Sequence, residues 1–288
     1  MPDLAPVYDL LAQLLPFDIL QMRFMQRALL GLLLVAPMTA AMGVQTVNLR
    51  MAFFADAISH SAFAGVALGL LTALHPHWTM PLFGLLVGLV IMAIHRHSQL
   101  STDTVIGVVF AAVMAFGLAL VSREAGLARD LQRFLYGDIL TIDETELWVL
   151  AALLGAVGLF QYLSYNRLLY ISLHPVLAQA HGVRVAGYQY AFAGLLALVV
   201  MLSIWAVGVL LVTALLIVPA AAARNFARSA GAMGWWALVI SVSAAVAGLL
   251  VSAQPWARTA TGPTVILCGC VWFAFSLLVS ALRARGRT

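Results

Sequence analysis

Residues 188–223 read YQYAFAGLLALVVMLSIWAVGVLLVTALLIVPAAAA, a stretch without a charged side chain. A bilayer core about 30 Å thick needs roughly 20 consecutive apolar residues for each helical span. The stretch is therefore long enough for two spans that meet at Gly208, or for one long helix broken near the outer surface. Similar apolar runs, separated by short polar gaps, continue from Leu20 to Leu282. Together they predict eight or nine membrane-spanning helices.

The composition supports the same fold class. Of 288 residues, 64% are hydrophobic and 9% are charged, whereas about a quarter are charged in an ordinary soluble domain. The mean hydropathy is +1.02. No segment is long and polar enough to form a separate soluble domain. We therefore predict an all-α polytopic membrane protein with one membrane domain over residues 20–282 and a function that is carried out within the membrane.

Both ends of the chain lie outside this domain. Residues 1–19 contain acids but no Arg or Lys, which is the wrong charge for a cleaved signal peptide. We expect an amphipathic segment that stays attached on the periplasmic side, and a basic cytoplasmic tail at 283–288. The predicted spans are 20–44, 52–74, 78–95, 103–122, 147–166, 188–206, 208–223, 234–253 and 264–282.

The orientation follows from the arginines. One set of connections has a single acid, Asp103, and contains Arg50, Arg96, Arg167, Arg184, Arg224 and Arg228. The other set mixes Arg123, Arg129, Arg133 and Arg258 with Glu124, Asp130, Asp138, Asp143, Glu144 and Glu146. By the positive-inside rule the first set and the C-terminus are cytoplasmic, and an odd number of spans places the N-terminus outside. Arg23 and Arg27, near the outer end of the first span, are the exceptions.

The chain contains no lysine. A Walker A loop needs a Lys to reach the nucleotide phosphates, so this chain cannot hold an ordinary P-loop. Any energy from ATP has to come from a partner chain. The H-E-x-x-H and G-x-S-x-G signatures are also missing from the sequence, and we do not expect an enzyme.

Two ionisable residues lie within the predicted second span. Residues 50–61 read RMAFFADAISHS, and Asp56 and His60, four residues apart, share one helix face. Ionisable side chains inside a membrane are costly and usually face a cavity or a partner. A carboxylate with an imidazole suits Zn²⁺ or Mn²⁺. The pair is either part of a metal path or a hydrogen bond that holds helices together.

One Asp and one His are too few for a closed tetrahedral site, but two copies of the chain around a two-fold axis would supply four ligands. The remaining histidines and cysteines are weaker candidates, because loop solvation, helix ends and small buried side chains explain them equally well. They are His75, His77, His95, His97, Cys268 and Cys270.

The largest cytoplasmic gap runs from Asn166 to Gly187. Within it, residues 172–182 read SLHPVLAQAHG and predict a short helix, with Pro175 in its first turn and Gly182 at its end. A short helix on the cytoplasmic face is a surface against which a partner protein can push. An ordinary interfacial linker is the alternative.

Several short motifs follow one another along the chain. The first motif is Phe54-x-Asp56-x-x-x-His60. The others are GVALG at 65–69, TDTVIG at 102–107, YGDIL at 136–140, PVLA at 175–178 with Gly182, GVLLVTALLIVPAAAARNFARS at 208–229 and TGPTVIL at 261–267. In this order they resemble the motifs of the permeases of zinc and manganese ABC importers, and above all the zinc-uptake permeases. The resemblance covers residues 24–282.

This resemblance implies a type II ABC importer-like permease that moves a divalent metal, most often zinc, from periplasm to cytoplasm across the inner membrane. The metal would be cargo, not a resident cofactor. The implied partners are a second permease, two cytoplasmic ATPase subunits, a periplasmic metal-binding protein and membrane lipid, with no nucleic acid. Asp56 and His60 would line the ion path. A coupling helix at about 174–187 would dock on the ATPase through His174, Pro175, Leu177, Ala178 and Gly182.

The chain departs from the family pattern at three positions. Val176 and His181 stand where the family usually or often has an acid, and Arg258 replaces an acid of the last outer loop. These departures bear on ATPase coupling and on the transfer of cargo from the binding protein. Manganese or iron are alternative cargoes in the same system. A gradient-driven metal carrier and a non-transporting membrane scaffold are the two other classes of function.

Overall fold

The computed structural model describes Tyr8 and residues 21–122 and 139–285, and these residues are almost entirely helical. Within them, nine helices have the length and apolar composition needed to cross a bilayer. The fold class predicted from composition is confirmed, and the nine candidate spans in these residues match the larger of the two predicted numbers. The predicted N-terminal segment, apart from Tyr8, lies outside the described residues, as does the loop carrying Arg123, Arg129 and Arg133.

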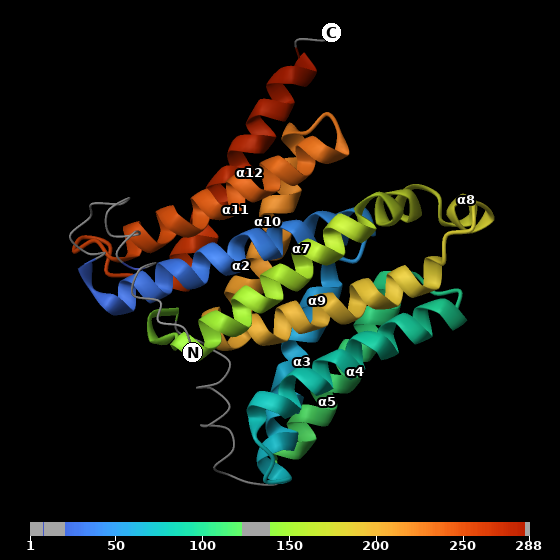
Figure 1. The fold of residues 1–288 in the computed structure, drawn as a ribbon, viewed down its shortest axis with the longest axis horizontal. Helices are drawn as coiled ribbons and strands as arrows, with labels where there is room; N and C mark the ends of the chain where they lie inside the picture. The colour runs from blue at the N-terminus through green and yellow to red at the C-terminus, as the bar shows by residue number, and fades with distance from the viewer. Residues whose placement is uncertain (1–7, 9–20, 123–138, 286–288) are drawn as a thin grey trace.

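Figure 1 shows the helices with their labels. Their bounds are α2 Arg23–Asn48, α3 Ala52–Leu71, α4 Pro76–His97, α5 Thr102–Val121, η2 Ile139–Thr141, α7 Glu144–Leu173, α8 Pro175–Ala180, α9 Val185–Val207, α10 Val209–Phe226, α11 Ala230–Ser252 and α12 Thr261–Arg285. All except the single-turn η2 and the short α8 are candidate spans.

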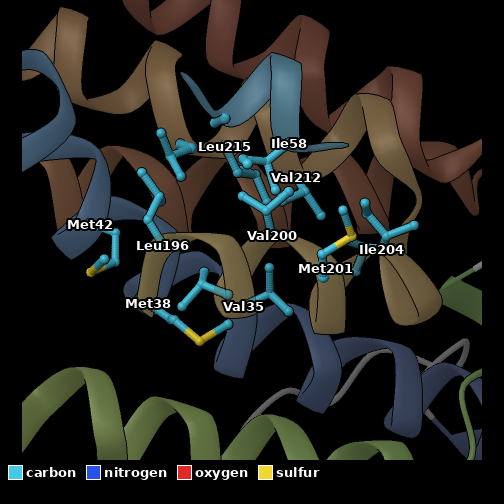
Figure 2. Close-up of a cluster of buried hydrophobic side chains, with 14 of the residues drawn as sticks. Val35, Met38, Met42, Ile58, Leu196, Val200, Met201, Ile204, Val212 and Leu215 are labelled. Atoms are coloured by element: carbon cyan, nitrogen blue, oxygen red, sulfur yellow. The ribbon is translucent and has the colours of Figure 1, made fainter. Parts of the chain in front are cut away.

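The helices form two groups joined through α9. Helices α3, α4 and α5 pack on one another, and α2, α10, α11 and α12 make up the second group together with α7. α9 contacts both groups and lies between them in Figure 1. Side chains from α2, α3, α9 and α10 meet in the buried cluster drawn in Figure 2, which contains Val35, Met38, Met42, Ile58, Leu196, Val200, Met201, Ile204, Val212 and Leu215.

A single residue separates α9 from α10. Gly208 has φ 82° and ψ 161°, a combination that is open almost only to glycine because it has no Cβ. The long apolar stretch at 188–223 is therefore two helices with a sharp change of direction at Gly208, and not one long helix.

Of the two arginines at the start of α2, Arg27 has an acidic partner in the tertiary structure. The Arg27 guanidinium donates a hydrogen bond to Glu144 at the start of α7, with 2.9 Å between Nη2 and Oε1. An acid from the same side of the molecule thus balances Arg27, which the positive-inside count treated as an exception. The pair also joins the first turns of α2 and α7.

The connection between α7 and α9 is more helical than the sequence predicts. α7 continues to Leu173, beyond the predicted end at 166, and α9 begins at Val185. Arg167 is accommodated past the expected end because its guanidinium lies 5.4 Å from the ring centre of Tyr188 on α9 and hydrogen-bonds to the Tyr188 hydroxyl. The short helix is therefore limited to Pro175–Ala180, within the range of 174–187 expected for it.

Candidate functional site

Asp56 and His60 lie in the first half of α3. With a rise of 1.5 Å per residue, Asp56 is about 6 Å and His60 about 12 Å along the helix from Ala52. Most of the helix is buried against α4, α5, α9 and α10. The side chains of His60 and Asp56, however, are 41% and 46% exposed. The pair therefore faces outward from the single chain, on the one accessible stripe of a largely buried helix.

The two side chains approach each other without a hydrogen bond. The distance between His60 Nε2 and Asp56 Oδ1 is 3.7 Å, which is beyond hydrogen-bonding range. The alternative interpretation of this motif was a hydrogen bond between Asp56 and His60 that holds helices together. The observed distance does not favour such a hydrogen bond. A carboxylate and an imidazole at this separation leave room for an ion to bind both.

Phe110 of α5 contributes the contact that orients the imidazole. Its ring and that of His60 are 5.5 Å apart between centroids with an interplanar angle of 79°, an edge-to-face arrangement. Such aromatic pairs hold a defined geometry. Phe110 was not predicted from the sequence, and an isolated Phe in an apolar span carries no signal that distinguishes it from its neighbours.

The described part of one chain supplies only two ligands at this position. Over residues 21–122 and 139–285, no group of three or more His, Cys, Asp or Glu side chains is arranged to hold a metal ion. Closed zinc sites have four ligands, so a zinc ion bound by this pair would need further ligands from outside these two side chains.

Two of the other candidate histidines, His77 and His97, make contacts away from this pair. His77, in the first turn of α4, stacks on Trp205 of α9, with 4.1 Å between ring centroids and an interplanar angle of 15°. In the last turn of α4, His97 Nδ1 donates to the Ala93 carbonyl over 2.8 Å. These contacts match the weaker role that the sequence suggested for both residues.

Helix α8 forms the second candidate region. Figure 1 places it at the edge of the molecule, past the ends of α7 and α9. Pro175 occupies its first turn, and Gly182, with φ 79°, ends it. Of the residues expected to contact an ATPase, His174, Pro175, Leu177 and Gly182 are exposed, whereas Ala178 is buried. Ala178 therefore packs α8 against the rest of the protein, and the other four residues face outward.

Comparison with known proteins supports the resemblance found in the motifs. The chain matches the ABC 3 transport family over residues 21–280. It is 34% identical over 252 residues to the high-affinity zinc uptake system membrane protein ZnuB of Haemophilus influenzae, covering 87% of this chain and 95% of that protein. It is 31% identical over 267 residues to the manganese import system permease protein ScaB of Streptococcus parasanguinis, covering 93% and 94%.

A solved structure has the same fold. PsaBC from Streptococcus pneumoniae in complex with Fab contains a chain that matches with a TM-score of 0.75 and 29% identity, covering 94% of this chain and 95% of the other. The family match, the relatives and the structure all extend over nearly the whole chain, which confirms the family inferred from the ordered motifs. This multi-pass membrane protein therefore belongs to the ABC 3 transport family.

Proposed function

We propose that the chain is the membrane-spanning permease of an ABC importer that carries zinc from the periplasm to the cytoplasm across the inner membrane. The observation that carries the proposal is the outward-facing Asp56–His60 pair on α3, since ionisable side chains within a span are rarely retained without a use. A nitrogen and a carboxylate oxygen are ordinary zinc ligands.

Manganese is the second candidate cargo. The ScaB relative is named for manganese import, and the same two ligand types also serve manganese and iron. A gradient-driven carrier has less support because the chain belongs to an ABC transport family.

The ion path is proposed to form between two copies of the permease. Each copy supplies one Asp and one His, and a two-fold axis beside α3 would bring four ligands together. The partial exposure of both side chains in the single chain is what such an arrangement requires. Ligands shared between two subunits also separate easily, and a transported ion has to be released.

Two further partners belong to the proposal. The sequence has no lysine for a P-loop, so ATP hydrolysis is assigned to a separate cytoplasmic subunit that docks at α8. A periplasmic metal-binding protein would deliver the ion to the outer face. His174, Pro175, Leu177 and Gly182 are the residues proposed to meet the ATPase.

Uptake of radioactive zinc tests the proposal. Cells that lack their own zinc importer would express the chain with its cognate ATPase and binding protein, and wild type would be compared with Asp56→Ala and His60→Ala. We expect uptake to need the ATPase and to fall at least tenfold in both variants, with unchanged amounts of permease in the membrane. His97→Ala is the matched control, because His97 is exposed at a helix end, and it should transport like wild type.

The outcomes separate the parts of the proposal. Normal transport by Asp56→Ala and His60→Ala would assign the pair to structure alone. Manganese uptake without zinc uptake would replace the cargo and leave the permease function in place. Uptake that continues without the ATPase would contradict the ABC mechanism itself.

A further inference from the structure

Helix α8 is too short to hold its own orientation. It has six residues, and isolated helices shorter than about 12 residues are marginal in water. Its only buried residue is Ala178, a side chain too small to prevent rotation. Other contacts therefore have to determine which way its exposed residues point.

One of these contacts joins the end of α8 to the last turn of α7. The Tyr170 hydroxyl oxygen lies 3.0 Å from His181 Nδ1, and the two rings pack at 5.9 Å between centroids with an interplanar angle of 64°. His181 follows α8 directly as its C-terminal capping residue. The two residues are eleven positions apart in the chain. Tyr170 precedes the turn at His174 and His181 follows it, so their contact closes the segment that contains this turn.

The hydrogen-bond pattern identifies the donor. His181 Nδ1 is also 2.8 Å from the Leu177 carbonyl, and a carbonyl oxygen can only accept. Nδ1 therefore carries the hydrogen, and it donates both to Leu177, within α8, and to the Tyr170 oxygen, on α7. One N–H thus couples the end of α8 to the neighbouring span.

The contact between Tyr170 and His181 leaves several apolar side chains of this segment exposed. Val176 is 79% exposed and Leu177 is 49% exposed, and Leu173 at the end of α7 is exposed as well. These side chains lie on the segment that carries the arginines assigned to the cytoplasm, next to His174 and Arg184. Exposed apolar side chains with polar neighbours are typical of a protein-binding surface.

We propose that Tyr170 and His181 are positioning residues that hold α8 in the orientation in which Leu173, Val176 and Leu177 engage the ATPase subunit. This inference rests on the proposed function. It assigns a role to His181, one of the positions at which the chain departs from the family pattern, and to Tyr170, which no motif singles out.

A double-mutant cycle on the purified permease in lipid nanodiscs tests the inference. The Kd of the cognate ATPase subunit would be measured for wild type, Tyr170→Phe, His181→Ala and the double variant. Each single variant is expected to weaken binding about fivefold, which corresponds to about 1 kcal/mol. Either change removes the same contact. The Kd of the double variant should therefore be no higher than that of the single variant with the higher Kd.

Two further variants distinguish positioning from general stability. His181→Asn places an amide donor near the position of Nδ1 and should restore most of the binding. Tyr162→Phe is the matched control, because Tyr162 lies on the same helix but is 87% exposed, and the Kd of this variant should equal that of wild type. The melting temperatures of all variants should stay within about 2 °C of wild type.

Every outcome bears on the inference. Wild-type Kd in both Tyr170→Phe and His181→Ala would overturn it, as would additive losses or a failure of His181→Asn to restore binding. Wild-type permease that does not bind the ATPase at all would contradict the proposed function instead, and the uptake experiment above would then fail as well.

Discussion

Gly208 controls the path of the chain between α9 and α10. Its φ of 82° and ψ of 161° lie in a region that costs a residue with a Cβ about 1–3 kcal/mol. We predict that Gly208→Ala lowers the melting temperature of the detergent-solubilised protein by several degrees and reduces transport, since the angle between the two spans changes.

Gly187→Ala is the control for this substitution. Gly187 lies in the first turn of α9, has no positive φ, and an added Cβ would be 3.9 Å from its nearest neighbour atom. Alanine there should leave stability unchanged or raise it slightly, because alanine favours a helix. Equal melting temperatures for the two variants would show that the backbone at Gly208 is not restricted to glycine.

Phe110 affects the candidate site through the contact of its ring with the His60 imidazole. Edge-to-face aromatic pairs are worth about 0.5–1.5 kcal/mol, so Phe110→Leu should free the His60 imidazole and raise the half-saturating zinc concentration for uptake about threefold to tenfold. Phe116→Leu removes a ring of the same helix that stacks on Phe83 instead, and it should leave that concentration unchanged. Identical uptake curves for wild type and Phe110→Leu would exclude a role in orienting the ligand.

At the scale of whole elements, the close crossing of α2 and α10 governs the packing of the second helix group. A Cβ at Gly43 would overlap the backbone carbonyl of Leu216, and backbone cannot move aside as a flexible side chain can. Small residues at such crossings allow helices in membranes to approach closely.

We predict that Gly43→Ala separates these two helices and destabilises the protein by about 1–3 kcal/mol or more, the usual cost of overpacking. Size-exclusion profiles after heating would report the loss. Gly155→Ala, on α7, is the control, because an added Cβ there has no neighbour within 4 Å. A wild-type profile for Gly43→Ala would mean that the crossing tolerates a wider spacing.

The orientation of the whole molecule is a prediction that labelling can test. The arginine distribution places the connection between α4 and α5 in the cytoplasm and that between α11 and α12 outside. Arg27, one of the two exceptions to this count, pairs with Glu144, so its charge is matched within the structure.

Single cysteines would be introduced into a variant carrying Cys268→Ala and Cys270→Ala. A membrane-impermeant maleimide should label Gln254→Cys in intact cells, and Gln99→Cys only after permeabilisation. Both positions lie in connections between spans. The opposite labelling pattern would invert the topology and place α8 on the outer face, where no ATPase could reach it.

Much of the candidate site was predictable from the sequence, and the reason is energetic. Asp56 and His60 stand out because charged and polar side chains are costly in lipid, and their spacing of four puts them on one helix face. Pro175 and Gly182 mark the short helix through local backbone preferences. The ends of α7 and α9 were less predictable, because Arg167 and Tyr188 stabilise the extra turns through a contact between two helices.

The sequence by itself therefore determined the fold class, the approximate spans, the predicted orientation and the outstanding ionisable pair. Each of these depends on local properties, since every segment that crosses a membrane must be apolar and must satisfy its own backbone hydrogen bonds. Only the tertiary structure decided that Phe110 packs on His60 and that Arg27 pairs with Glu144. Those features arise where segments distant in the chain come together, and apolar composition, which makes every span alike, does not specify which faces of the helices meet.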